Sequence, residues 1–161
     1  MTAKTTHLAT YVGLLHRAEE TLADSFVTVG HGHRAEPDVF HTCDSLAAMS
    51  RAHQELLAPV AARYGEQRSG NDVEEPERLH ADGIAGTREG AVGLLRDLQD
   101  LYLLATLVHS SWTVVSQAAQ GARDRELIEI AQHCSGETSR QLTWLQTRIK
   151  VSAPQALLVA Q

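Results

Sequence analysis

The segment Leu94–Ala119, LLRDLQDLYLLATLVHSSWTVVSQAA, constrains the fold more than any other part of the chain. Leu98, Ala105 and Trp112 recur at a seven-residue spacing, with further apolar residues between them. This spacing is typical of a helix that packs one face against other helices. Because apolar residues occupy nearly the whole circumference near the middle of the segment, we expect this helix to be central or to bury a second face in an oligomer. His109 lies close to the middle of the apolar stripe and is titratable.

Length and composition indicate a single domain of ordinary globular type. The chain has 161 residues, of which 43% are hydrophobic and 21% charged, and its net charge is −6. This charge, without a dense run of Lys and Arg, argues against nucleic-acid binding. No apolar run is long enough to span a bilayer, and the first twenty residues predict an amphipathic helix rather than a signal peptide. Cys43 and Cys134 are too few for a disulfide scaffold or a cysteine-based zinc site, so we expect a reduced, cytoplasmic protein.

The chain divides into four helical segments. Heptad-spaced apolar residues, a glycine-broken turn near residue 30, Pro37 and Gly121 place the helices at about residues 6–29, 37–64, 94–120 and 124–150. The heptad spacing of apolar residues is absent over residues 65–93, where glycine, proline and charged residues predominate. In an all-helical chain, so long a connection predicts a crossover that runs the length of an antiparallel bundle. Residues 151–161 form an apolar tail that we expect to pack across the bundle or onto a neighbouring subunit.

Two helical hairpins joined by one long crossover resemble the ferritin-like superfamily over nearly the whole chain. The segments RDLQDLYLLA, QAAQGARDREL and RQLTWLQTRIKVSAPQALL also resemble those of a group of bacterial ferritin-like proteins. The resemblance implies an all-α bundle with inward-facing carboxylates and histidines that hold metal ions.

Four polar residues on or beside the apolar stripes are the candidate metal ligands: Glu19, His53, His109 and Glu137. Buried polar groups are costly unless they are paired, so their positions need a reason. Glu19 lies about 11 residues and His53 about 16 residues from the first turn, a difference of about 8 Å along the helix axes. His109 and Glu137 lie at similar distances from the second turn, so a full-length crossover brings all four to the middle of the bundle.

Carboxylate and imidazole ligands suit iron, manganese or zinc. The ferritin-like di-iron pattern is incomplete, because Ser50 stands where a glutamate would precede His53 by three residues, and Glu129 precedes His133 by four. A single ion fits better than a dinuclear centre. The same residues also fit a hydrogen-bonded core network without metal, in which Glu19 is ionised against a protonated His53. His133 and Cys134 are further candidates on the fourth helix.

The sequence therefore predicts a ferritin-like metal-binding protein with a redox-linked or storage-related role, as a homo-oligomer of two or more subunits. The alternative is a non-catalytic bundle that serves as an assembly or interaction module, in association with a redox enzyme complex. A third interpretation is small-molecule binding in the core near Met49 and Trp112. His31 and His33 form an H-x-H pair, which indicates a solvated turn or a surface metal patch.

Overall fold

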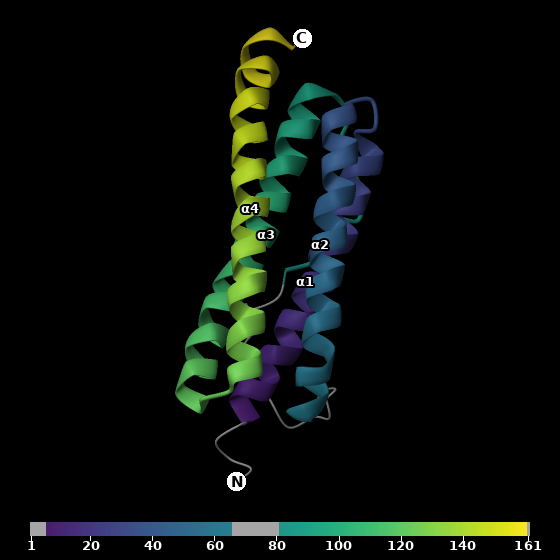
Figure 1. The fold of residues 1–161 in the computed structure, drawn as a ribbon. Helices are drawn as coiled ribbons and strands as arrows, with labels where there is room; N and C mark the ends of the chain where they lie inside the picture. Colours follow the sequence, from purple (N-terminus) through teal and green to yellow (C-terminus); the bar gives the residue numbers. More distant parts are fainter. Residues whose placement is uncertain (1–5, 66–80, 161) are drawn as a thin grey trace.

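The computed structural model describes residues 6–65 and 81–160, and this part of the chain is all-helical. Its elements are α1 (Thr6–Gly32), α2 (Pro37–Arg63), α3 (Gly90–Ala122), α4 (Arg125–Pro154) and a short π-helical turn, η1 (Gln155–Val159). No described helix is long and apolar enough to cross a membrane. The fold is a bundle of four long helices in which α2 returns beside α1 and α4 returns beside α3 (Figure 1).

Four helix boundaries differ by two residues or more from those predicted. Helix α1 continues through Gly30 to Gly32, α3 begins at Gly90 rather than Leu94 and continues through Gly121 to Ala122, and α4 continues from residue 150 to Pro154. The extra turns arise because packing overrides the helix-breaking tendency of isolated glycines and of Pro154. Residues 155–159 of the predicted tail are also helical, and within them only Ala156 is buried. The middle of the predicted crossover, residues 66–80, lies outside the described residues.

Contacts between side chains show which helix ends lie together. His33, just after α1, bonds Asp97 near the start of α3. Tyr64, just after α2, bonds Asp124, which caps the start of α4. The end of α2 and the start of α3 therefore lie at opposite ends of the bundle. Of the crossover between them, residues 81–89 are described, and Ile84 in this stretch donates its N–H to Ser25 of α1.

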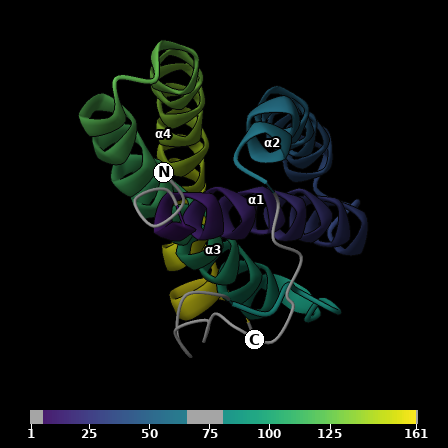
Figure 2. The ribbon, with the colours of Figure 1, turned by 90° about the horizontal axis from the view of Figure 1, so that it is seen from below.

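The helices pack in a ring. The hairpin pairs α1–α2 and α3–α4 have the most extensive contacts, α1–α3 fewer and α2–α4 the fewest. Seen from below, α1 lies between α2 and α3 (Figure 2). The core is formed by the predicted apolar stripes, and its largest fully buried apolar side chains are Trp112, Phe26, Leu15, Leu22, Leu57, Leu98, Leu101, Leu127 and Leu145. Burial of such stripes supplies the main driving force for folding.

The turn between α1 and α2 depends on close packing against the crossover. A Cβ atom at Gly32 would collide with the side chain of Thr87, so only glycine allows the end of α1 to approach the crossover this closely.

At the opposite end of the bundle, the Asp124 side chain accepts a hydrogen bond from the N–H of Leu127 and caps α4.

Candidate functional site

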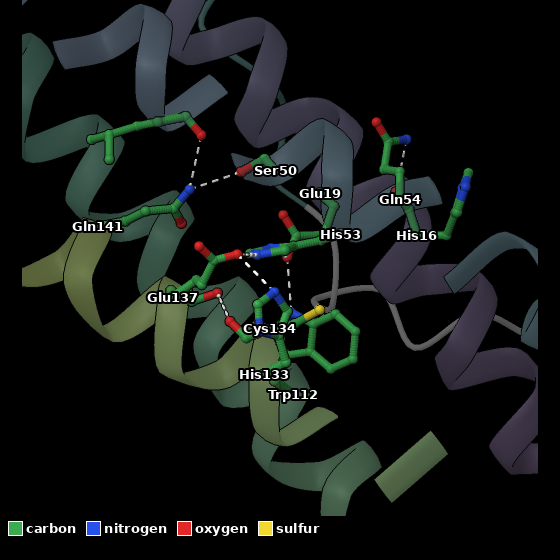
Figure 3. Close-up of polar contacts among 12 residues, drawn as sticks. His16, Glu19, Ser50, His53, Gln54, Trp112, His133, Cys134, Glu137 and Gln141 are labelled. Carbon is green, nitrogen blue, oxygen red and sulfur yellow. Dashed lines mark hydrogen bonds and ion pairs between the residues drawn. The ribbon is translucent and has the colours of Figure 1, made fainter. Parts of the chain in front are cut away.

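A carboxylate–histidine cluster occupies the middle of the bundle. His53 of α2 lies between Glu19 of α1 and Glu137 of α4 (Figure 3). Its Nδ1 is 3.0 Å from Glu19 Oε1, and its Nε2 is 3.1 Å from Glu137 Oε1. His53 and Glu19 are fully buried, and the Glu137 side chain is 20% exposed. The structure thus brings together three of the four predicted ligands.

The two carboxylates determine the charge of His53. Burial lowers the pKa of His53, but the hydrogen bonds and charges of Glu19 and Glu137 outweigh it, so the pKa of His53 is raised above 6.5. Each ring nitrogen faces a carboxylate oxygen, and an ionised carboxylate can only accept. The imidazolium form, with a proton on both nitrogens, therefore satisfies both contacts.

Trp112 is the residue of α3 that contacts the cluster. Its indole Nε1–H donates to Glu19 Oε1 at 2.8 Å, and its ring lies edge-on to His53. Glu19 Oε1 thus has two donors, whereas Glu19 Oε2 is buried and has no hydrogen-bond partner within the described chain. A buried acceptor left unpaired costs about 1–3 kcal/mol, so Oε2 is a position at which a cation or a donor would be stabilised.

His133 connects the buried cluster to the surface. Its Nε2 lies 3.1 Å from Glu137 Oε1, and its side chain is 57% exposed. The His133 and His53 rings are 6.3 Å apart, centroid to centroid. Two imidazoles therefore flank the Glu137 carboxylate, one inside the bundle and one at the solvent.

His109, the fourth predicted ligand, does not join the cluster. It is half-buried, and its Nε2 lies 3.1 Å from the Ser139 hydroxyl of α4. Trp112, three residues further along α3, is the side chain that reaches Glu19. Because α3 is apolar nearly all round, its sequence pattern did not indicate which of these two positions points toward the other helices' polar groups.

Two further buried polar side chains, both on α4, lie next to the cluster. Gln141 Nε2 donates to the Leu46 carbonyl and to the Ser50 hydroxyl, both at 3.0 Å, while Gln141 Oε1 is buried without a partner among the described residues. Burial raises the pKa of the Cys134 thiol, and the charges of Glu19 and Glu137 raise it further. Cys134 is therefore a neutral thiol and not a ready thiolate ligand.

The donor set agrees only in part with the metal site that the ferritin-like resemblance implies. Two carboxylates, two imidazoles and the unpaired Glu19 Oε2 suit one divalent transition-metal ion. A dinuclear set is not available, because Ser50 and Trp112 stand where carboxylates are needed. In the side-chain positions of the described residues, no three His, Cys, Asp or Glu donors are arranged to hold an ion. Both nitrogens of His53 face carboxylates, so this residue has to lose a proton before it can act as a ligand.

Comparison with protein-family models, with curated proteins and with solved structures finds no match to this chain.

Proposed function

We propose that this chain is an antiparallel, ferritin-like bundle that binds one iron, manganese or zinc ion at Glu19, His53, Glu137 and His133. The observation that carries the proposal is the contact of two carboxylates with two imidazoles from three helices, in a cluster where Glu19 Oε2 is buried without a partner in the described chain. The paired helix ends support the ferritin-like connection, because the end of α2 and the start of α3 lie at opposite ends of the bundle.

The residues of the cluster have separate roles in this proposal. Glu19 supplies the buried negative charge, Trp112 holds Glu19 Oε1 in place, and His133 with Glu137 forms the side open to solvent. Because His53 carries protons toward both carboxylates, uptake of an ion releases at least one proton to the medium. A bound iron or manganese ion supplies the one-electron chemistry of a redox-linked or storage role, and zinc a structural or Lewis-acid role.

Metal content measured by plasma mass spectrometry on untagged protein, purified without chelator and then reconstituted with each metal, tests this proposal. We expect about one ion per chain in the native protein and less than a tenth of that in Glu19→Gln/His53→Leu. Glu129→Gln, an exposed carboxylate on the same helix as Glu137, is the matched control and retains the metal. His109→Ala also retains it, because His109 contacts Ser139 instead of the cluster.

Two outcomes contradict the metal proposal. The first is full metal content in the double variant with unchanged helical circular dichroism. The second is no bound ion in native protein after reconstitution with all three metals, which leaves the cluster as an ionic core network.

A specific observation favours the second candidate function, an assembly module. Val151, Leu157, Leu158 and Val159 are 61–83% exposed at the carboxyl end of α4 and in η1. We propose that this end contacts another copy or a protein partner, such as a subunit of a redox complex, since exposed apolar groups that lie together mark interfaces. Sedimentation analysis of Leu157→Asp/Leu158→Asp is expected to show a smaller assembly than the native chain. Leu103→Asp, an equally exposed leucine on α3, serves as the control and leaves the assembly intact.

A further inference from the structure

A cavity lies at the end of the bundle where α1 turns into α2, far along the helices from the central cluster. It has a volume of about 550 Å³, and it is bounded by this turn, the start of α3 and the end of α4. Ala35, Leu94 and Val151 provide apolar walls. This volume lies in the range of pockets that hold small organic ligands.

A buried histidine with a fixed orientation lines this cavity. His33 is 8% exposed, and its Nε2 lies 2.6 Å from Oδ2 of the fully buried Asp97. Asp97 also accepts the backbone N–H of Arg88 at 3.0 Å and its Nη1 at 2.7 Å. Because the Asp97 carboxylate accepts, His33 carries a proton on Nε2. His33 Nδ1 makes no hydrogen bond within residues 6–65 and 81–160.

The charge around the cavity is negative. Both arginines that line it are already paired, Arg88 with two aspartates and Arg148 with Asp38 and Glu36. The lining itself carries two arginines and two glutamates, and the three aspartates that pair with these arginines bring the total to five carboxylates against two guanidiniums, an excess of three negative charges. The carboxylates are Glu36, Asp38, Glu89, Asp97 and Asp100. The amino end of α3 adds about half a positive charge, which is smaller than this excess.

Two of these carboxylates have acceptor capacity to spare. Glu36 meets Arg148 at 3.5 Å, and its side chain is 52% exposed. Glu89 precedes α3 but makes no side-chain capping hydrogen bond. Glu36 and Glu89 thus present acceptors beside apolar walls, which suits a donor that is positively charged and carries hydrocarbon.

We propose that this cavity binds a small organic amine in its protonated form, with its ammonium groups at Glu36 and Glu89 and its aliphatic part against Ala35, Leu94 and Val151. An organic cation fits better than a metal ion, because no three metal-binding side chains of the described residues converge here and the volume exceeds that of an ion. This site is independent of the metal proposed for the central cluster.

Calorimetric titration at low salt with 1,4-diaminobutane tests the proposal, with butane-1,4-diol and succinate as comparison probes. We expect one diamine per chain and no measurable binding of the neutral or anionic probe. Glu36→Gln/Glu89→Gln is expected to weaken diamine binding at least tenfold. Glu55→Gln, an exposed carboxylate on α2 outside the cavity, is the matched control and leaves the affinity unchanged.

A second variant separates a defined site from diffuse attraction by a negatively charged surface. Ala91 lines the cavity, so Ala91→Phe reduces its volume without changing its charge. We expect loss of diamine binding with unchanged helical circular dichroism. Retained affinity in Ala91→Phe, unchanged affinity in the double glutamine variant, or tighter binding of succinate than of the diamine each overturns the proposal.

Discussion

Two buried histidines, His53 at the middle of the bundle and His33 at its end, each meet a buried carboxylate from another helix. At His53 both ring nitrogens face carboxylates, 3.0 and 3.1 Å away, and the ring is fully buried. At His33 one nitrogen is 2.6 Å from Asp97, and the ring borders a cavity. The same pair of residue types therefore produces a closed ionic network in one place and an oriented ring with an open side in the other.

The carboxylate partners differ as much as the rings do. Glu19 has neutral Trp112 as its other donor and one unpaired oxygen. Asp97 accepts two further hydrogen bonds from Arg88. It would therefore still be paired with a cation if His33 were replaced. The fold therefore depends on His53 to neutralise Glu19, whereas Asp97 has a second source of positive charge.

The largest expected effect is a difference in stability between two matched substitutions. His53→Leu leaves the buried Glu19 carboxyl group without its cationic partner in the core, which we expect to lower the free energy of unfolding by about 3–5 kcal/mol. His33→Leu leaves Asp97 on Arg88 and is expected to cost about 1–2 kcal/mol. Urea unfolding followed by circular dichroism, with chelator present, measures both. Equal losses in the two variants would contradict the contrast between the two sites.

A double-mutant cycle sharpens this test. Glu19→Leu/His53→Leu removes both the buried carboxylate and its imidazolium, so its cost is expected to fall well below the sum of the two single substitutions. Additive losses would mean that the packing volume of these side chains, and not their charge, accounts for the single-variant results.

The sequence predicted the all-helical fold and most of the central cluster for a physical reason. Glu19 and His53 lie on heptad stripes with apolar neighbours on both sides, and a polar residue in such a register has to face the other helices. Trp112 was placed on the stripe as an apolar residue, and its role as a donor was missed because periodicity carries no information about hydrogen bonding. His109 was misplaced because the apolar surface of α3 is too broad to specify an angle.

The cavity end of the molecule was much less predictable. His33 was expected in a solvated turn or a surface metal patch, and Asp97 was not among the candidate residues. Their bond joins residues 64 positions apart, and it exists because the crossover brings Arg88 and the start of α3 to the end of α1. Periodicity within one helix cannot predict such a contact, since it depends on how the connections place helix ends relative to one another.

The smaller expected effect is a pH dependence that belongs to His53. Its folded pKa is raised above 6.5 by Glu19 and Glu137 despite burial, so its ionic contribution to stability is fully present below that value and declines as the pH rises through the folded pKa. We therefore expect the difference in unfolding free energy between the native chain and His53→Gln to be largest at pH 6 or below and to shrink at alkaline pH. Urea titrations at a series of pH values, with chelator present, measure this difference while other titrating groups cancel between the two proteins. A difference that grows with pH would mean that His53 is neutral when buried, and the central cluster would then not be an ionic network.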